Sequence, residues 1–420
     1  MNVRKGLFAC ASVGLLLASQ GAFGFGMMEV GEWKVEFSGN VNGFISDVKC
    51  EADSNPANGV LVLSGLACGS LTGTDYNDNN IRTGLLPSWF GFHAERTEEN
   101  TKYGITIGFQ PGIDGANQGG RIDGGLGLNA SNFRQVFLEW SGTNWGGIKI
   151  GRDLGIFGSD AILSDMTLLG VGTVSDLTRG GGNTSLGRIG VGYLYADWKG
   201  QVQYSSPKWG GFSFNVALVD PWGLVALAGT ATSANAATFA QEGSTYGLEG
   251  KVAYTWEGSV GGKVWVSAIN QSIKTTNPML SDQDATGYDV GAKVSIAGFE
   301  AVGYYYAGEG IGSTGFLFDA VDALGNTRDS DGMYLQLTYK LPGPGTKFGV
   351  SWGESNLDRG PADPVTTSLF ETNESIVVGI YHPLTSALHL VAEYTQTEST
   401  AHNQNKAKET AIAFGAILFY

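Results

Sequence analysis

Residues 333–345 read MYLQLTYKLPGPG, an alternating run that ends in a turn. The odd-numbered residues from 333 to 339 are apolar, and the polar residues Gln336, Thr338 and Lys340 fall at the other positions. Because side chains alternate between the two faces of a strand, this run predicts a strand with one apolar and one polar face. The Pro-Gly-Pro-Gly that follows predicts a tight turn.

The same period of two recurs along the whole chain. It is clear at residues 33–38, 103–109, 212–218, 388–395 and 412–420. Short turns alternate with long polar stretches, among them residues 114–129, 226–243, 311–331 and 356–373. Short turns at one end and long loops at the other are typical of an outer-membrane barrel. The pattern predicts an all-β, closed antiparallel transmembrane β-barrel of about 16 strands, an even number as bacterial barrels require.

The composition agrees with β-structure and excludes several other classes of protein. Gly accounts for 65 of the 420 residues, which disfavours a helical fold because Gly weakens helices. The 42% hydrophobic content is too high for a disordered chain. Mean hydropathy is only -0.03, and no run of about 18 apolar residues, as a spanning helix needs, is present. A net charge of -15 without clustered Lys and Arg excludes nucleic acid as a partner.

A soluble β-sandwich or propeller would show the same alternation, so the pattern alone leaves these folds open. Three further features favour the membrane barrel. Aromatic residues gather at strand ends, no repeat of propeller length is visible, and the chain stops inside a strand on the aromatic Tyr420. The aromatic residues at strand ends include Trp33, Trp140, Trp145, Trp209, Trp256 and residues 304–306.

The N-terminus has the features of an export signal. Arg4 and Lys5 precede an apolar run over residues 7–18, and Ala22 and Gly24 supply the small residues of a cleavage site. We therefore expect a signal peptide over residues 1–24 and a single barrel domain over 25–420.

Two cysteines remain after that cleavage, Cys50 and Cys68, on either side of a polar loop. An even number of thiols in an oxidising compartment predicts a disulfide. A zinc site is disfavoured because two Cys with no His nearby cannot complete one. We expect no metal and no cofactor.

Several segments resemble the general porins of the Gram-negative outer membrane, and in the order that family shows. Residues 133–142, a turn and residues 147–152 are similar to the hairpin before the porin constriction loop. Residues 160–166 resemble the start of that loop, which we place at about 154–189. Residues 204–214 and 382–398 resemble further porin hairpins. The C-terminal strand ending in Tyr420 is similar to the signal read by the barrel-assembly machinery, although porins usually end in Phe.

The resemblance implies a homotrimer of water-filled barrels in the outer membrane, in contact with lipid and lipopolysaccharide. Small hydrophilic solutes and ions would diffuse through each barrel. In such porins, acidic residues on the inward loop face basic residues on the wall and select solutes by charge. The residues that the resemblance suggests for this constriction are Asp165, Asp160, Asp176, Arg134, Arg152, Arg179, Arg188, Trp89 and His93.

Some positions depart from the porin pattern. Leu169 stands where a second loop acid is common, and Trp89 and His93 lie in a strand that usually carries a base. We therefore expect a weak transverse field that favours cations or weakly charged solutes over anions. Asp160, Asp165 and Asp176 are alternatively capping or solvent-facing loop residues.

Two further kinds of function stay open. A substrate-specific channel would share the same fold. An enzymatic, adhesive or structural barrel is the alternative of a different class, but none of the four His lies in a recognisable catalytic signature, so we expect no catalytic residues.

Overall fold

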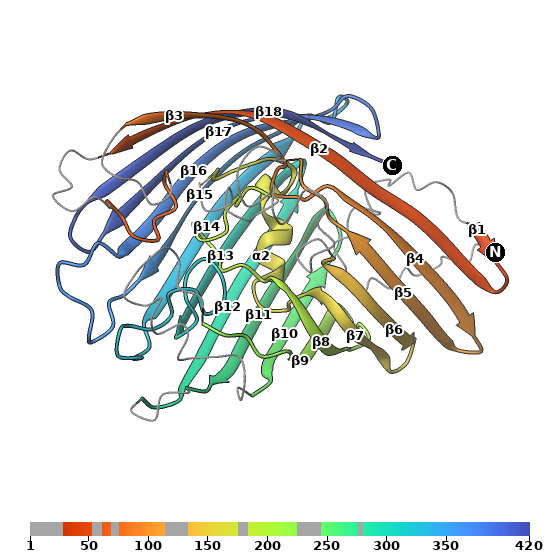
Figure 1. Cartoon of the computed structure of the whole chain (residues 1–420). Coiled ribbons are helices and arrows are strands. Elements are labelled where there is room, and N and C mark those ends of the chain that lie inside the picture. The colour runs from red at the N-terminus through yellow and green to blue at the C-terminus, as the bar shows by residue number, and fades with distance from the viewer. Residues whose placement is uncertain are drawn as a thin grey trace.

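The computed structural model describes residues 28–52, 61–68, 75–113, 133–174, 184–224, 245–275 and 280–420, and these form one closed antiparallel barrel (Figure 1). Sixteen strands form the ring, and two extra strands, β1 and β3, pair with β2. The first half of the chain supplies β1(Met28–Val30), β2(Trp33–Ala52), β3(Tyr76–Arg82), β4(Trp89–Glu98), β5(Thr101–Phe109), β6(Gln135–Gly142), β7(Gly146–Leu154), β8(Trp198–Ser205) and β9(Phe212–Val219). The second half supplies β10(Gly247–Trp256), β11(Val260–Ile273), β12(Gln283–Ile296), β13(Phe299–Glu309), β14(Asp329–Lys340), β15(Lys347–Leu357), β16(Phe370–Pro383), β17(Leu388–Ala401) and β18(Lys406–Phe419).

The ring closes between the first and last long strands. β18 pairs with β2 from Ala407↔Ala52 to Phe419↔Asn40, and the backbones of Gly39 and Tyr420 exchange two hydrogen bonds of 2.9 Å. β3 and β4 share the other edge of β2, with the break between them at residues 83–88. The all-β barrel of about 16 strands is therefore confirmed.

The outer and inner faces of the strands have opposite character. On β11, the outward residues Val264 and Val266 are 41% and 55% exposed, whereas the inward residues Trp265 and Ser267 are buried. Exposed apolar side chains repeat in the same way around the ring. Such an outer surface suits hydrocarbon, and the polar residues turn inward.

The connections differ in length at the two ends. Turns such as 143–145 and 297–298 join strands at one end, and longer segments join them at the other. In outer-membrane barrels the short turns face the periplasm and the long loops face outward. The predicted signal peptide lies outside the described residues, and its cleavage site stays a prediction.

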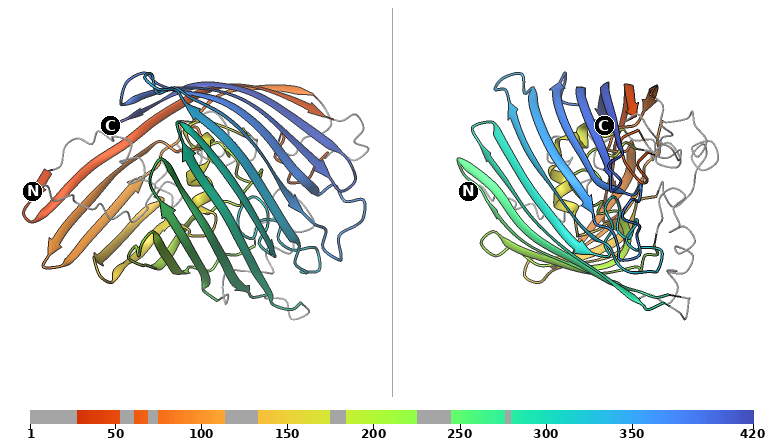
Figure 2. Two further views of the ribbon diagram at one scale, coloured as in Figure 1. Left: turned by 180° about the vertical axis from the view of Figure 1, so that it is seen from behind. Right: turned by 90° about the vertical axis from the view of Figure 1, so that its left-hand side faces the viewer.

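One long connection turns into the barrel. It runs from β7 to β8 and carries α2(Ser159–Ser164) and η2(Met166–Leu169), and both ribbon views place α2 inside the curve of the sheet (Figure 2). A buried apolar cluster joins this connection to the inner faces of β11, β13 and β14; its members include Phe157, Ala161, Tyr193, Trp265, Ile269, Tyr304 and Tyr334. Across the described ranges, none of the helices has both the length and the apolar composition that a membrane crossing requires.

Candidate pore constriction

The connection between β7 and β8, described at residues 155–174 and 184–197, is named here the inward loop. Its start is held by carboxylates of the opposite wall. Glu249 of β10 accepts the backbone N–H groups of residues 156 and 157 at 2.5 and 2.9 Å. Asp289 of β12 accepts the N–H of Gly158 at 2.9 Å. Because charged acceptors strengthen hydrogen bonds, these two side chains fix where the inward loop begins.

Carboxylates from the last two strands hold the inward loop further along. Glu393 of β17 accepts the N–H groups of residues 171 and 172 at 2.7 and 2.8 Å, and also the hydroxyl of Tyr381 at 2.6 Å. Glu409 of β18 accepts the N–H of Val174 at 3.3 Å. The inward loop therefore crosses the barrel and lies against the wall from β10 to β18.

Asp160, in the first turn of α2, forms the clearest charged contact between loop and wall. Its carboxylate is paired with Lys251 of β10 at 2.8 Å and with Lys263 of β11. Burial by itself raises the pKa of Asp160, but the two ammonium groups outweigh burial and lower it to about 2. Asp160 is therefore a permanent anion that neutralises part of a basic wall.

Asp165 lies between α2 and η2 and is 4% exposed. Its oxygens accept hydrogen bonds from the N–H and hydroxyl of Thr167 at 2.8 and 2.7 Å, and from the hydroxyl of Tyr193 at 2.9 Å. Burial raises the pKa of Asp165, although the nearby charge of Arg188 and these hydrogen bonds oppose the rise. Asp165 caps η2 from a buried position, which is the alternative role that the sequence left open.

Arg188 is completely buried between the inward loop and the wall. Its guanidinium donates to the hydroxyl of Ser351 at 2.5 Å and to the carbonyl oxygens of Ser351, Ser375 and Val191. Burial lowers the pKa of Arg188, and the charge of Asp165 opposes that shift. The side chain attaches the second half of the inward loop to β15 and β16.

A closed barrel whose inward loop is tied to the wall is the arrangement of a channel protein. The Gram-negative porin family matches residues 7–402 of the chain. The chain belongs to the Gram-negative porin family. This porin is an outer-membrane channel through which small solutes diffuse passively.

Solved structures share the porin's fold at low sequence identity. The outer membrane channel DcaP of Acinetobacter baumannii has a TM-score of 0.63 at 14% identity, over 94% of this chain and 99% of its own. An anion-selective porin from Comamonas acidovorans has a TM-score of 0.58 at 14% identity, over 93% and 100%. OmpF of Salmonella typhi, solved with daunomycin, has a TM-score of 0.52 at 14% identity, over 93% and 100%. The comparison with curated proteins gives no match.

Two other predicted basic residues in the described ranges, Arg134 and Arg152, both act on Asp197 at the end of the inward loop. Arg134 precedes β6, and its backbone N–H donates to Gln110 Oε1 at 3.0 Å. Arg152 is directly opposite Val136, whose side chain is exposed on the outer face. Because paired residues face the same side of a sheet, the backbone position of Arg152 belongs to the outward row. Burial raises the pKa of Asp197, and the charges of both arginines partly offset that rise.

Trp89 and His93 lie on β4, both half-buried. His93 Nδ1 is 3.0 Å from the hydroxyl of Thr106, and Nε2 is 3.6 Å from the carboxylate of Glu95. Asp176 and Arg179 lie outside the described residues. The roles of these residues in the constriction stay predictions.

The predicted disulfide between Cys50 and Cys68 is present, with Cα atoms 5.6 Å apart. Within the described ranges, the one group of three potential metal ligands consists of these two cysteines and Glu409. Their sulfurs are bonded to each other and offer no thiolate to a metal.

The sequence reasoning missed four lysines on the inner wall. The inward-facing positions of β10, β11, β12 and β15 include, in that order, Lys251, Lys263, Lys293 and Lys347. Each is next to an outward apolar residue, as Lys263 is to Val264. The period of two is therefore enough to predict that these lysines face inward, whereas the porin resemblance points to arginines at other positions.

Proposed function

We propose that this porin conducts small hydrophilic solutes through the lumen that the inward loop narrows, with a preference for anions. The inward loop is tied to the wall from β10 to β18 and leaves the rest of the lumen to solutes. The observation that carries the anion preference is the group of inner-wall lysines.

The lysines gather toward the short-turn end of the barrel. Lys263 lies three residues after the start of β11, Lys293 three residues before the end of β12, and Lys347 begins β15. Lys263 and Lys293 are directly opposite each other, with side chains 28% and 34% exposed. Partly exposed like charges in a confined lumen concentrate counter-ions.

Only part of this positive charge is neutralised by its resolved neighbours. Asp160 pairs with Lys251 and Lys263, and Glu300 lies 3.9 Å from Lys293. Within the described ranges, the ion pairs thus join three of the four ammonium groups to two carboxylates, whereas Lys347 lies over the ring of Tyr381 and feels the charges of Glu300, Asp165 and Glu393. This proposal replaces the cation preference expected from the sequence, because that expectation counted arginines and overlooked the lysines. The Comamonas acidovorans porin of the same fold is anion-selective.

Reversal potentials across a planar bilayer in a KCl gradient test the proposal. We expect an anion-favouring potential from the wild type, and a roughly twofold lower chloride-to-potassium permeability ratio from K293Q/K347Q. Lys208→Gln is the matched control, since Lys208 is exposed in the turn after β8. A cation-favouring wild type, or equal effects of the double variant and the control, would contradict the preference. Block by a single solute at low concentration would instead favour a substrate-specific channel.

We further propose a homotrimer that acts without catalysis and is embedded in lipid and lipopolysaccharide. OmpT of Vibrio cholerae, which has the same fold, is described in a trimer form. The backbone of Tyr420 is hydrogen-bonded to Gly39 at the seam, and the centroid of its ring lies 5.9 Å from that of Phe37. These contacts support the proposal that the strand ending in Tyr420 is a signal read by the barrel-assembly machinery. Light scattering in detergent measures the oligomeric state, and large stable conductance steps distinguish a channel from an adhesive or enzymatic barrel.

A further inference from the structure

A second segment also lies inside the barrel. Residues Leu61–Cys68 belong to the connection between β2 and β3, and Leu61, Val62, Leu66 and Ala67 are at most 1% exposed. Leu63 pairs with the connection before β16: its N–H donates to Ser368 O at 2.7 Å, and its carbonyl accepts from Phe370 N at 3.0 Å. This segment, named here the pinned segment, is a packed part of the interior.

Successive residues of the pinned segment contact successive strands. The N–H of Leu66 donates to the Asn373 side chain on β16 at 3.1 Å, and that of Ala67 to Ser399 on β17 at 2.9 Å. The N–H of Cys68 donates to Glu409 on β18 at 2.9 Å. The disulfide then joins Cys68 to β2, the next strand around the ring. The pinned segment therefore runs across four adjacent strands rather than along one.

An apolar cluster holds the other side of the pinned segment. Leu61, Val62 and Ala67 pack with buried residues of β15–β18 and the connection before β16, namely Leu357, Leu369, Phe370, Ala401 and Ala407. Burial of these side chains contributes roughly 25 cal/mol for each Å² removed from water. These contacts explain how the pinned segment, which belongs to a long loop between β2 and β3, stays inside the lumen.

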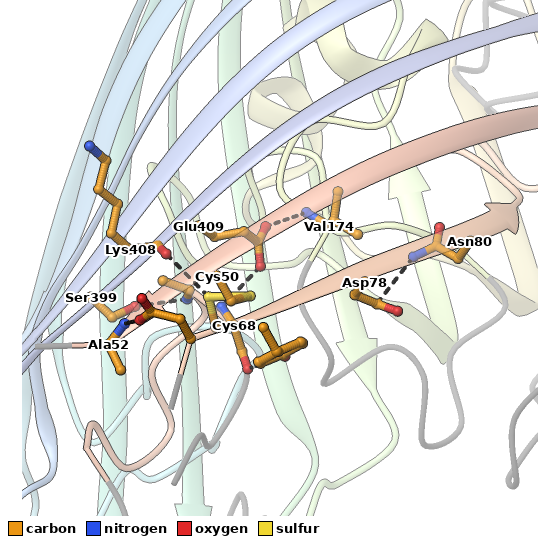
Figure 3. Close-up of a disulfide and its surroundings, with 12 residues drawn as sticks. Cys50, Ala52, Cys68, Asp78, Asn80, Val174, Ser399, Lys408 and Glu409 are labelled. Carbon is orange, nitrogen blue, oxygen red and sulfur yellow. Dashed lines mark hydrogen bonds between the residues drawn. A yellow bond between two sulfur atoms is a disulfide. The ribbon is translucent and has the colours of Figure 1, made fainter. Parts of the chain in front are cut away.

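The pinned segment and the inward loop meet at one carboxylate. Glu409 is 2% exposed; one of its oxygens accepts the N–H of Cys68 and the other accepts the N–H of Val174 (Figure 3). The two segments also touch directly, because a Cβ at Gly190 would lie 2.7 Å from Leu66 Cδ1. The same wall carboxylate therefore holds both segments.

We propose that the pinned segment is a second constriction element, and that the Cys50–Cys68 disulfide and Glu409 set the width of the pore by holding it and the inward loop together. This inference rests on the channel function proposed above. The segment takes lumen space beside β16–β18 and contacts the inward loop at Gly190. Glu409 acts as a positioning residue for both elements, and the disulfide keeps the end of the segment at β2.

The test compares wild type, C50A/C68A and Glu409→Gln by single-channel conductance and by the size cut-off for neutral sugars in liposome swelling. Neutral sugars report width without the effect of the charge that E409Q removes. We expect C50A/C68A to raise conductance roughly 1.5-fold and to admit larger sugars, since permeation of a neutral solute follows pore diameter. E409Q should also raise the conductance and the sugar size cut-off, but by less than C50A/C68A does. Asp47→Asn, on the exposed outer row of β2, is the control for removal of one acid.

The outcomes separate the two proposals. A wild type that does not conduct defeats the channel function itself. A conducting wild type with the same conductance and cut-off in folded C50A/C68A overturns the second constriction, and heat-dependent gel mobility verifies the fold. If the double variant does not fold, E409Q decides: an unchanged sugar cut-off in folded E409Q overturns the proposal, and a larger cut-off supports it.

Discussion

Replacement of Asp160 by Asn tests the electrostatic attachment of α2 to the wall. The substitution preserves size but removes the charge that pairs with Lys251 and Lys263. The pKa of Asp160 falls from an ordinary 3.8 to about 2, and one pKa unit corresponds to about 1.4 kcal/mol. The carboxylate is nearly buried, so little solvent screening applies, and D160N should lower the free energy of unfolding by about 2 kcal/mol at neutral pH.

The pH dependence of that loss identifies its cause. Because the folded-state pKa is depressed, the stabilisation is complete above pH 3.8 and disappears as pH falls through about 2. The difference between wild type and D160N should therefore be largest above pH 4 and should vanish below pH 2. Tryptophan fluorescence during urea unfolding, in detergent at several pH values, measures it.

A second readout follows from the same change. D160N leaves Lys251 and Lys263 without their shared anion, so the reversal potential should move further toward anions. Asp47→Asn removes an acid from the outer face and should change neither quantity. Equal stability of wild type and D160N at pH 7, or a difference that stays constant down to pH 2, would refute the reasoning.

Two further substitutions test other attachments. Arg188→Met removes the buried guanidinium and leaves the carbonyl oxygens of Ser351 and Ser375 without these donors. Because an unsatisfied buried group costs about 1–3 kcal/mol, the urea midpoint should fall, and an unchanged midpoint would contradict the assigned role. Gly39→Val places a side chain against the carbonyl of Trp89 at the barrel seam. Because overpacking costs about 1–3 kcal/mol, the temperature at which the gel mobility shifts should fall. Normal heat resistance would show that the seam adjusts.

The fold could be predicted from the sequence because it depends on local pattern. The period of two at residues 333–340 and elsewhere fixes which side chains point outward, and the order of turns and loops fixes the antiparallel sequence of strands. The split of one strand position into β3 and β4 was not predicted, since both halves pair with the same strand, β2, and the break is set by that pairing.

The constriction was harder to predict because its contacts join distant parts of the chain. Asp160 was a candidate from its place in the inward loop, but its partners Lys251 and Lys263 lie about 90 and 100 residues further on. The place of Arg152 in the constriction stays a prediction. Arg152 shares parity with Ile148 and Ile150, both apolar, so the alternation places its backbone in the outward row, whereas the porin resemblance places its side chain at the constriction.

The way in which the inward loop is held explains why its own sequence says little about its position. The groups of the inward loop that donate to Glu249, Asp289, Glu393 and Glu409 are backbone N–H groups, which every residue except Pro supplies. Much of the information for docking therefore resides in the wall, at inward positions of β10, β12, β17 and β18, and the loop side chains Asp160 and Arg188 add to it. Loop side chains that do not contact the wall are correspondingly free to set charge and width. We therefore expect that a change of selectivity can arise from the loop without loss of its path, whereas removal of a wall carboxylate should displace the path itself.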